Sequence, residues 1–220
     1  MHCCFSGRED AGGEVTIDGI VIPKVEKFKY ISSIVQQNGE IDEDINQRIK
    51  VGWQKWKQAT GVLCDRRMPV RLKGKVYRTV VRPVVLYGSE CWPIKKTQVL
   101  RLMVAEMRMI RWMCGYTRMD RIRNEVIRDL VKVAPIEGKM RETRLRWFGH
   151  VKRRSVDAPV RSCERINTPV GKRGRGRPKK SLDEVIRDDL KVAGLTEDLS
   201  QDRRLWRDKI KVLDLRQSAL

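Results

Sequence analysis

The stretch Lys139-Met-Arg-Glu-Thr-Arg-Leu-Arg-Trp-Phe-Gly-His-Val-Lys-Arg-Arg154 predicts the helix around which the rest of this chain is organised. At 3.6 residues per turn, its apolar side chains fall on or near one stripe and its basic side chains crowd the remaining arc. The stripe holds Ile136, Met140, Trp147, Phe148 and Val151, and the arc holds Lys139, Arg141, Arg144, Arg146, Lys152, Arg153 and Arg154. We therefore expect the stripe, Trp147 included, to pack on a protein core while the basic face meets a polyanion. His150 is expected on the helix surface, as neither a metal ligand nor a catalytic base.

The positive charge of the chain is concentrated in and just after this helix. The whole chain of 220 residues has a net charge of +20 and a pI near 10.1. Between Lys139 and Lys180, fifteen Lys and Arg residues stand against three acidic residues. A basic run taken alone is more often a solvated surface, but here the excess continues beyond the helix. We therefore rank nucleic acid ahead of an anionic membrane surface and predict no membrane partner.

The apolar residues set the broad class of the protein. No stretch of about 18 apolar residues is present, so the sequence predicts no membrane-spanning helix. The first residues contain no apolar segment of signal-peptide length. We therefore expect a nuclear or cytoplasmic protein, or both, that is not secreted. A chain of this length forms one sizeable domain or two small ones.

The cysteines do not predict a metal site. They stand at irregular spacing, without a Cys-x-x-Cys pair, and the chain has two histidines. A long-range zinc site built from Cys114, His150 and Cys163 is conceivable but lacks a fourth ligand at a familiar spacing. We expect free, mostly buried thiols instead.

The expected fold is mainly α, with a short N-terminal β-hairpin or extended element, a helical bundle, and a basic linker before two terminal helices. Asp18-Gly19 between β-branched runs predicts a hairpin turn, and residues 27–35 read as a second extended run. The expected division is a disordered segment 1–13, a β element 14–40, a helical region 41–155, a basic flexible linker 156–180 and a C-terminal helical pair 181–220.

Helix start and stop signals place the helices. Pro83 is expected to end or kink the second helix, Thr97 to cap the third, and Ser181 with Glu184 to form a capping box. The helices are expected at about 42–64, 70–81, 97–114, 124–131, 139–154, 181–193 and 201–213.

Five separated motifs occur in a fixed order along the chain. They are Phe28-Lys-Tyr-Ile-Ser32, Val81-Arg-Pro-Val-Val-Leu-Tyr-Gly-Ser-Glu-Cys-Trp92, Met107-Arg-Met-Ile-Arg-Trp-Met-Cys-Gly115, Arg144-Leu-Arg-Trp-Phe-Gly-His150 and Gly176-Arg-Pro178. Together they resemble the C-terminal part of the reverse transcriptase of a non-LTR, LINE-type retrotransposon of the RTE-like kind. The resemblance runs from about Glu14 to Val212.

This resemblance implies a primer grip at the end of the palm, followed by thumb and post-thumb helices. It implies that Phe28 and Tyr30 contact nucleic acid. Where the family reads close to Tyr-Leu-Gly at the grip, this chain has Tyr30-Ile31-Ser32.

The resemblance also bears on catalysis. In the family, Mg²⁺-binding aspartates lie on palm strands upstream of the grip, and thirteen unpatterned residues precede Glu14 here. Asp188-Asp189 falls in a helical pattern and is expected on a solvated helix face. We therefore expect a chain that is not an enzyme and holds no cofactor, since Mg²⁺ belongs to the full-length family enzyme.

The segment Lys172-Arg-Gly-Arg-Gly-Arg-Pro-Lys-Lys180 is a second basic signal. Its Arg-Gly-Arg-Pro core is similar to an AT-hook, whose glycine allows close approach to the minor groove. A nuclear-import patch or a plain linker has the same composition. The residues expected to bind nucleic acid are Phe28, Tyr30, Arg141, Arg144, Arg146, Lys152, Arg153, Arg154, Lys172, Arg173, Arg175, Gly176, Arg177, Pro178, Lys179 and Lys180.

These observations predict a catalytically incomplete retrotransposon fragment. We expect it to bind RNA–DNA hybrid or duplex DNA with weak sequence preference, because Lys and Arg on a helix reach phosphates more readily than bases. We also expect self-association through the unpaired β element. The alternatives are a domesticated, AT-hook-like chromatin-binding protein and an inert helical remnant with no selected function.

Overall fold

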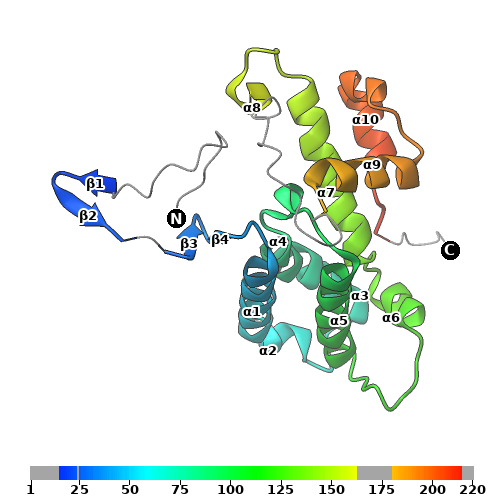
Figure 1. Cartoon of the computed structure of the whole chain (residues 1–220). Coiled ribbons are helices and arrows are strands. Elements are labelled where there is room, and N and C mark those ends of the chain that lie inside the picture. Colours follow the sequence, from blue (N-terminus) through cyan, green and yellow to red (C-terminus); the bar gives the residue numbers. More distant parts are fainter. Residues whose placement is uncertain (1–14, 24, 163–179, 215–220) are drawn as a thin grey trace.

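A computed structural model of the chain describes residues 15–23, 25–162 and 180–214. Two small hairpins lead into a helical body, in which helices far apart in the sequence lie side by side (Figure 1). The fold is mainly α with short N-terminal strands, so the expected fold class is confirmed. Residues 1–13 and the segment 172–179, about which the sequence made predictions, lie outside the described residues.

The elements have the following bounds. The strands are β1 (Val15–Ile17), β2 (Ile20–Ile22), β3 (Lys27–Tyr30) and β4 (Ser33–Gln36). The α-helices are α1 (Asp42–Gln58), α2 (Thr60–Leu63), α3 (Val70–Val76), α4 (Arg82–Val85), α5 (Lys96–Met113), α6 (Asn124–Val131), α7 (Ile136–Lys152), α8 (Pro159–Ser162), α9 (Leu182–Ala193) and α10 (Arg203–Ile210). The shorter segments are the π-helix η1 (Tyr77–Val81) and the 3₁₀ helices η2 (Ser89–Cys91) and η4 (Asp198–Gln201).

The first hairpin forms as the sequence predicts. Asp18 and Gly19 connect β1 to β2 with φ values of 51° and 78°, the left-handed conformation that a two-residue hairpin turn requires. The second segment differs from the expectation of one extended run. Ile31 and Ser32 also adopt positive φ, of 43° and 70°, and reverse the chain so that β3 and β4 pair antiparallel. Turn residues of these types are a poor local signal for positive φ, which is why the sequence did not predict this turn.

Two charged residues of α1 hold the second hairpin in place. The carboxylate of Asp44 accepts hydrogen bonds from the backbone N–H of Ile34 at 3.0 Å and from the indole N–H of Trp92 at 2.9 Å. The guanidinium of Arg48 donates to the carbonyl oxygen of Ser32 at 2.7 Å. Since Asp44 and Arg48 are buried, these bonds compensate the turn and fasten the hairpin to α1.

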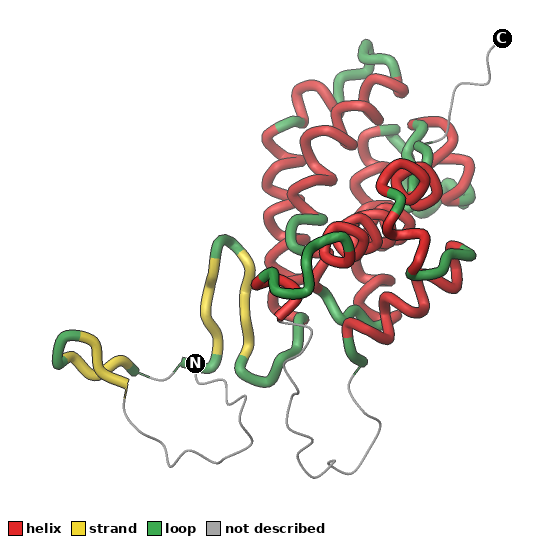
Figure 2. The backbone as a smooth tube through the Cα atoms, turned by 90° about the horizontal axis from the view of Figure 1, so that it is seen from above, coloured by secondary structure: helices red, strands yellow, loops and turns green. Residues whose placement is uncertain are grey.

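The hairpins stand beside the helical body and expose large apolar side chains (Figure 2). The exposed fractions of Ile17, Ile20, Phe28 and Tyr30 range from 50% to 71%. The predicted apolar surface on this β element is therefore present in the structure.

Self-association through this surface stays a prediction. Exposed apolar strands with unpaired edges favour pairing with another copy. We expect concentration-dependent dimers in sedimentation velocity, and a shift to monomer when Ile17 and Ile20 are both replaced by Lys. A wild-type chain that remains monomeric up to high micromolar concentration would contradict this.

Pro83 is expected to end or kink the second helix, and the structure shows that the helix does not end there. The chain continues from α3 through η1 into α4, and Pro83 lies in the first turn of α4. The backbone N–H of Arg82 bonds to the carbonyl of Tyr77, five residues back, which is the wider spacing of a π-helix. A new helix, α4, begins at Arg82, and the backbone N–H groups of a helix's first turn have no partner within the helix. Pro83 can therefore stand there although it has no N–H to donate.

Capping explains two other helix boundaries. The predicted capping box is present at α9, where Ser181 and Glu184 exchange hydrogen bonds of 3.2 Å. Thr97, by contrast, does not cap α5, because the helix starts at Lys96 and the Gln98 side chain accepts from the backbone N–H of Lys95 at 2.8 Å.

The larger of two hydrophobic clusters surrounds a buried carboxylate. Glu106 on α5 is 2% exposed and accepts from Tyr77, Arg82 and Arg128, with the Arg128 bond at 2.6 Å. Its carboxylate also accepts from the backbone N–H of Ile136, the first residue of α7, at 3.1 Å. One side chain thus joins η1, α4, α5, α6 and the start of α7.

A second carboxylate balances the charge of this cluster. Asp214 lies 3.2 Å from the Arg82 guanidinium and accepts from the backbone N–H of Ala134 at 3.0 Å. Burial acts to raise the pKa of Asp214, but the Ala134 hydrogen bond and the charges of Lys139 and Arg82 outweigh burial and lower it. Burial likewise opposes the charge of Arg82, yet Glu106 dominates and the pKa of Arg82 is raised.

The smaller cluster is built on the second half of α7. Leu145 and Phe148 of α7 pack with Leu190 of α9 and with Trp206 and Ile210 of α10. The first half of α7, at Ile136 and Met140, belongs to the larger cluster. Helix α7 therefore joins both clusters, as its central place in Figure 1 shows.

The ionic network predicts a large effect of one isosteric substitution. Glu106→Gln would leave Arg82 and Arg128 without their buried counter-charge, and we expect a loss of about 3–5 kcal/mol of unfolding free energy. Urea unfolding followed by circular dichroism measures this loss. The matched control is Glu125→Gln on the exposed face of α6, which should change the free energy by less than about 0.5 kcal/mol. Equal midpoints for the two variants would contradict the role given to Glu106.

Candidate nucleic-acid interface

The apolar stripe predicted for α7 is correct for Met140, Phe148 and Val151, which are at most 7% exposed. It is wrong for Trp147, whose exposed fraction is 40%. The stripe assumes one packing partner along the whole helix, whereas α7 leaves the larger cluster after Met140 and turns to α9 and α10. The face that buries Met140 is therefore partly open to solvent at Trp147.

The expected basic face of α7 is also divided by tertiary contacts. Arg144 is 4% exposed and donates to the Asp189 carboxylate at 2.7 Å, with Arg141 at 3.5 Å from the same carboxylate. The prediction that Arg144 lies on an outward cationic face is therefore wrong. So is the prediction for Asp189, which is 7% exposed, whereas Asp188 is exposed and pairs with Lys180 at 2.8 Å. These ion pairs join α7 to α9.

Lys139, also expected on the basic face, is drawn inward, since its side chain is 19% exposed and lies 3.1 Å from Glu142. Arg146 and Lys152 lie nearer the surface. The Arg146 side chain is 64% exposed and forms an ion pair with Glu142. Lys152 lies 3.5 Å from Glu197 and over the ring of Phe148. Phe28 and Tyr30 lie on the second hairpin, and the structure does not bring them together with the arginines of α7 (Figures 1 and 2).

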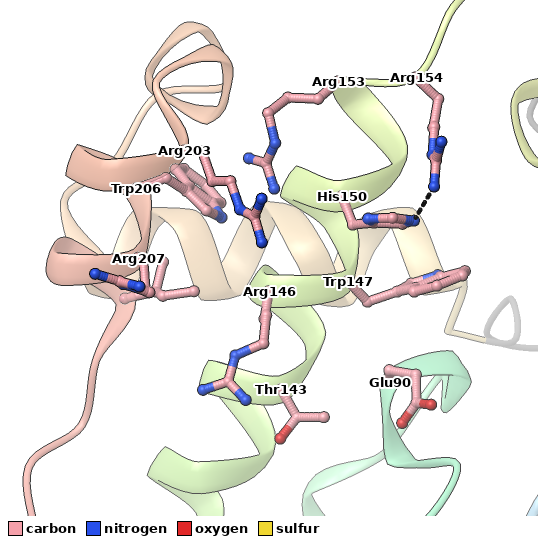
Figure 3. Close-up of a pocket in the computed structure, with 11 residues that line it drawn as sticks. Glu90, Thr143, Arg146, Trp147, His150, Arg153, Arg154, Arg203, Trp206 and Arg207 are labelled. Carbon is pink, nitrogen blue, oxygen red and sulfur yellow. Dashed lines mark hydrogen bonds between the residues drawn. The ribbon is translucent and has the colours of Figure 1, made fainter.

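A groove of about 810 Å³ lies where α7 and α10 meet (Figure 3). Arginines reach it from two segments that are about 50 residues apart in the sequence. Its lining residues are Glu90, Thr143, Arg146, Trp147, His150, Arg153, Arg154, Arg203, Trp206, Arg207 and Ile210. We call this the arginine groove.

Part of the charge in the arginine groove is uncompensated, although Arg146 pairs with Glu142 and Arg207 lies 3.9 Å from Asp208. Among the described residues, Glu90 is the acidic side chain of the lining, and neither Arg154 nor Arg203 has a carboxylate within 4 Å. The pKa of Arg153 is lowered, first by burial and then by the positive charge of Arg203. The positive charges of Arg153 and Arg203 repel each other, and an anion bound between them would reduce this repulsion.

The local sequence explains how α10 comes to lie here. A Cβ at Gly149 would overlap the Trp206 ring, so the glycine allows α10 to approach α7 closely. The indole N–H of Trp206 donates to the carbonyl of Leu145 at 2.9 Å. Asp202 caps α10 by accepting from the backbone N–H groups of Arg204 and Leu205 at 2.9 and 3.0 Å. This cap fixes the point where α10 begins and so places Arg203 at the groove.

Sequence reasoning missed Arg203 and Arg207. One local signal was present, because α10 carries arginines and no acidic residue in its first turn. Positive charge there is unfavourable for the helix dipole. The Asp202 cap compensates part of this charge, and the remaining break of a local rule is a sign of a binding role.

Other site types find little support in the described residues. Among residues 15–23, 25–162 and 180–214, no three His, Cys, Asp or Glu side chains gather closely enough to hold a metal ion, and no helix is long and apolar enough to cross a membrane. Cys64 and Cys91 are free but exposed, so the expectation of mostly buried thiols is wrong for them. Cys114 is half-buried, and burial raises its pKa to about 11.

Comparison with known proteins gives one informative result. No family model and no solved structure matches the chain. A Caenorhabditis elegans protein, named as transposon-derived and uncharacterized, is 25% identical over 137 residues, which are 59% of this chain and 48% of that protein. The similarity supports an origin in a transposable element. The matched region spans about half the length of this relative.

Substitutions of Arg144 and Arg146, which are two residues apart on α7, should differ strongly in their effect on stability. Arg144→Gln removes the shorter ion pair of the buried Asp189 carboxylate and leaves it the longer contact with Arg141, at 3.5 Å, so we expect a loss of up to about 3–5 kcal/mol of unfolding free energy. Arg146→Gln removes an ion pair whose guanidinium is 64% exposed, and the buried Glu142 carboxylate keeps its contact with Lys139 at 3.1 Å, so the change should cost less than about 1 kcal/mol. Urea unfolding compares the two, and hydrogen exchange should show faster exchange in α9 for the Arg144 variant. If adding Asp189→Asn did not restore part of the stability of Arg144→Gln, the assigned pairing would be wrong.

Proposed function

We propose that this chain binds nucleic acid without catalysing a reaction, through the arginine groove and the adjoining surface of α7. The observation that carries this proposal is the convergence of Arg153 and Arg203 in a groove with little acidic compensation. Guanidinium groups bind phosphate through paired N–H donors, so a polyphosphate backbone fits this surface better than a single carboxylate ligand does.

We further propose that the chain is a fragment of a LINE-type reverse transcriptase comprising the primer-grip, thumb and post-thumb parts. The transposon-derived relative supports the origin, and the ordered motifs support the type of element. The Arg-Leu-Arg-Trp-Phe-Gly-His motif falls on α7, where three of its residues have distinct roles. Arg144 pairs with Asp189 of α9, Gly149 allows α10 to approach closely, and Trp147 lines the groove.

The proposed partner is RNA–DNA hybrid or duplex DNA, contacted through phosphates and with weak sequence preference. The charges are held on helix surfaces, which suits contacts to a backbone rather than to base edges. The predicted nuclear or cytoplasmic placement, or both, is part of this proposal.

The absence of catalysis is proposed on the placement of the carboxylates. Asp189, half of the Asp-Asp pair, is bound to Arg144 and Arg141, which leaves it unsuited to hold a divalent cation. Extension of a primed RNA template in Mg²⁺ or Mn²⁺, above a no-protein control, would contradict this proposal.

The salt dependence of binding tests the assigned surface. The combined variant Arg154→Gln, Arg203→Gln and Arg207→Gln removes three groove charges that make no buried ion pair in the described part of the chain. Each phosphate contact contributes roughly 0.9 to the log–log slope of affinity against salt on duplex DNA, so the slope should fall by about two to three. Fluorescence anisotropy with a labelled 20-base-pair duplex at several salt concentrations measures the slope.

The matched control has the same net charge but a different place. Arg66, Arg67 and Arg71 are exposed beside the α2–α3 connection, and replacing all three by Gln should leave most of the slope intact. If both triple variants lower the slope equally, binding follows overall charge and the arginine groove is not the site. If neither does while residues 172–180 are required, the AT-hook-like alternative is favoured. Weak binding by every version, wild type included, favours the inert remnant.

A further inference from the structure

We propose that the arginine groove takes an unpaired nucleic-acid strand, with a base stacked at Trp147 and the neighbouring phosphates held by Arg153 and Arg203. This inference rests on the proposed function and names the form of nucleic acid that the groove receives. It departs from duplex binding alone, which the basic surface by itself would suggest.

The first observation is an aromatic platform at the groove. Trp147 is 40% exposed on a helix whose other large apolar residues are buried. Its ring lies against the ring of His150, with centroids 5.5 Å apart and planes inclined by 25°. Both residues line the groove, and the Arg154 guanidinium lies 3.4 Å from the His150 ring nitrogen (Figure 3). Because the two rings stack, each covers one face of the other, and a base can lie on an outer face of the pair.

The second observation is that the arginine side chains and the aromatic rings lie on different sides of the groove. Figure 3 shows Arg153 and Arg203 on one side of the α7 axis and Trp147 with His150 on the other. Arg153 is fixed by donating to the carbonyl of Ser200 at 2.6 Å, so one cationic group of the site is held in place. A strand that crosses α7 between these sides meets guanidinium groups with its phosphates and an aromatic ring with a base.

Base geometry then decides between paired and unpaired strands. In a duplex, each base face is covered by the neighbouring base pair, and only phosphates, sugars and base edges are offered to a protein. An unpaired strand offers base faces, and these stack on aromatic side chains with little sequence preference.

The test compares Trp147→Ala with wild type on four labelled probes. These are a 12-nucleotide oligo-dT, the matching oligo-rU, a 12-nucleotide strand with abasic sites throughout its centre, and a 20-base-pair duplex. We expect Trp147→Ala to weaken binding to the two base-bearing single strands by about 5-fold to 150-fold, the range for a lost base–aromatic stack. Binding to the abasic strand and to the duplex should change by less than about 2-fold. Trp147→Phe should retain most of the single-strand affinity, because it keeps a ring.

The matched control is Trp112→Ala on α5, which removes another exposed tryptophan, 64% exposed, away from the groove. It should leave all four affinities nearly unchanged, and circular dichroism checks that both variants are folded. An equal effect of Trp147→Ala on the base-bearing and abasic strands, or no effect on either, would overturn this inference. The proposed function would still stand if the three groove arginines lowered the duplex salt slope, and it would fail on its own if they did not.

Discussion

The buried carboxylate of Glu106 between Arg82 and Arg128 is the interaction on which the rest of the structure depends. Its carboxylate accepts hydrogen bonds from two guanidinium groups, one tyrosine hydroxyl and the first backbone N–H of α7 inside the larger cluster. Breaking such a network leaves charges buried without partners, which is far costlier than losing a surface ion pair. Because the start of α7 is tied to it, Glu106 sets where this helix leaves the larger cluster and therefore where the smaller cluster and the groove form.

The arginines of the chain fall into two groups, which cannot be told apart from the sequence. One group of arginines, represented by Arg82 and Arg144, is buried against carboxylates and joins helices. Another, represented by Arg154 and Arg203, lines a groove without carboxylate partners in the described part of the chain. The first group contributes to folding, and the second is the group that the proposed nucleic-acid binding requires.

Close packing of α10 on α7 brings arginines from both segments together in the groove. Gly149 admits the Trp206 ring, and the bond from Trp206 to the Leu145 carbonyl fixes the distance between the two helices. The same approach brings Arg203 beside Arg153 and leaves Trp147 uncovered at the edge of the groove. A nucleic-acid role for this surface and a transposon origin for the chain are thus compatible with the geometry, since the motif that resembles retrotransposon proteins supplies the helix on which the groove is built.

The element types and several boundaries can be predicted from the amino-acid sequence, because they depend on local chemistry. The Asp18-Gly19 turn, the Ser181–Glu184 capping box, helix 124–131 and the amphipathic helix α7 all follow from residues within a few positions of one another. The exposure of Trp147, the burial of Arg144 and the place of Arg203 in the groove depend instead on contacts between distant segments. Arg144 is buried against Asp189, 45 residues away, and Arg203 lies beside Arg153, 50 residues away. Helical periodicity carries no information over such distances in the sequence.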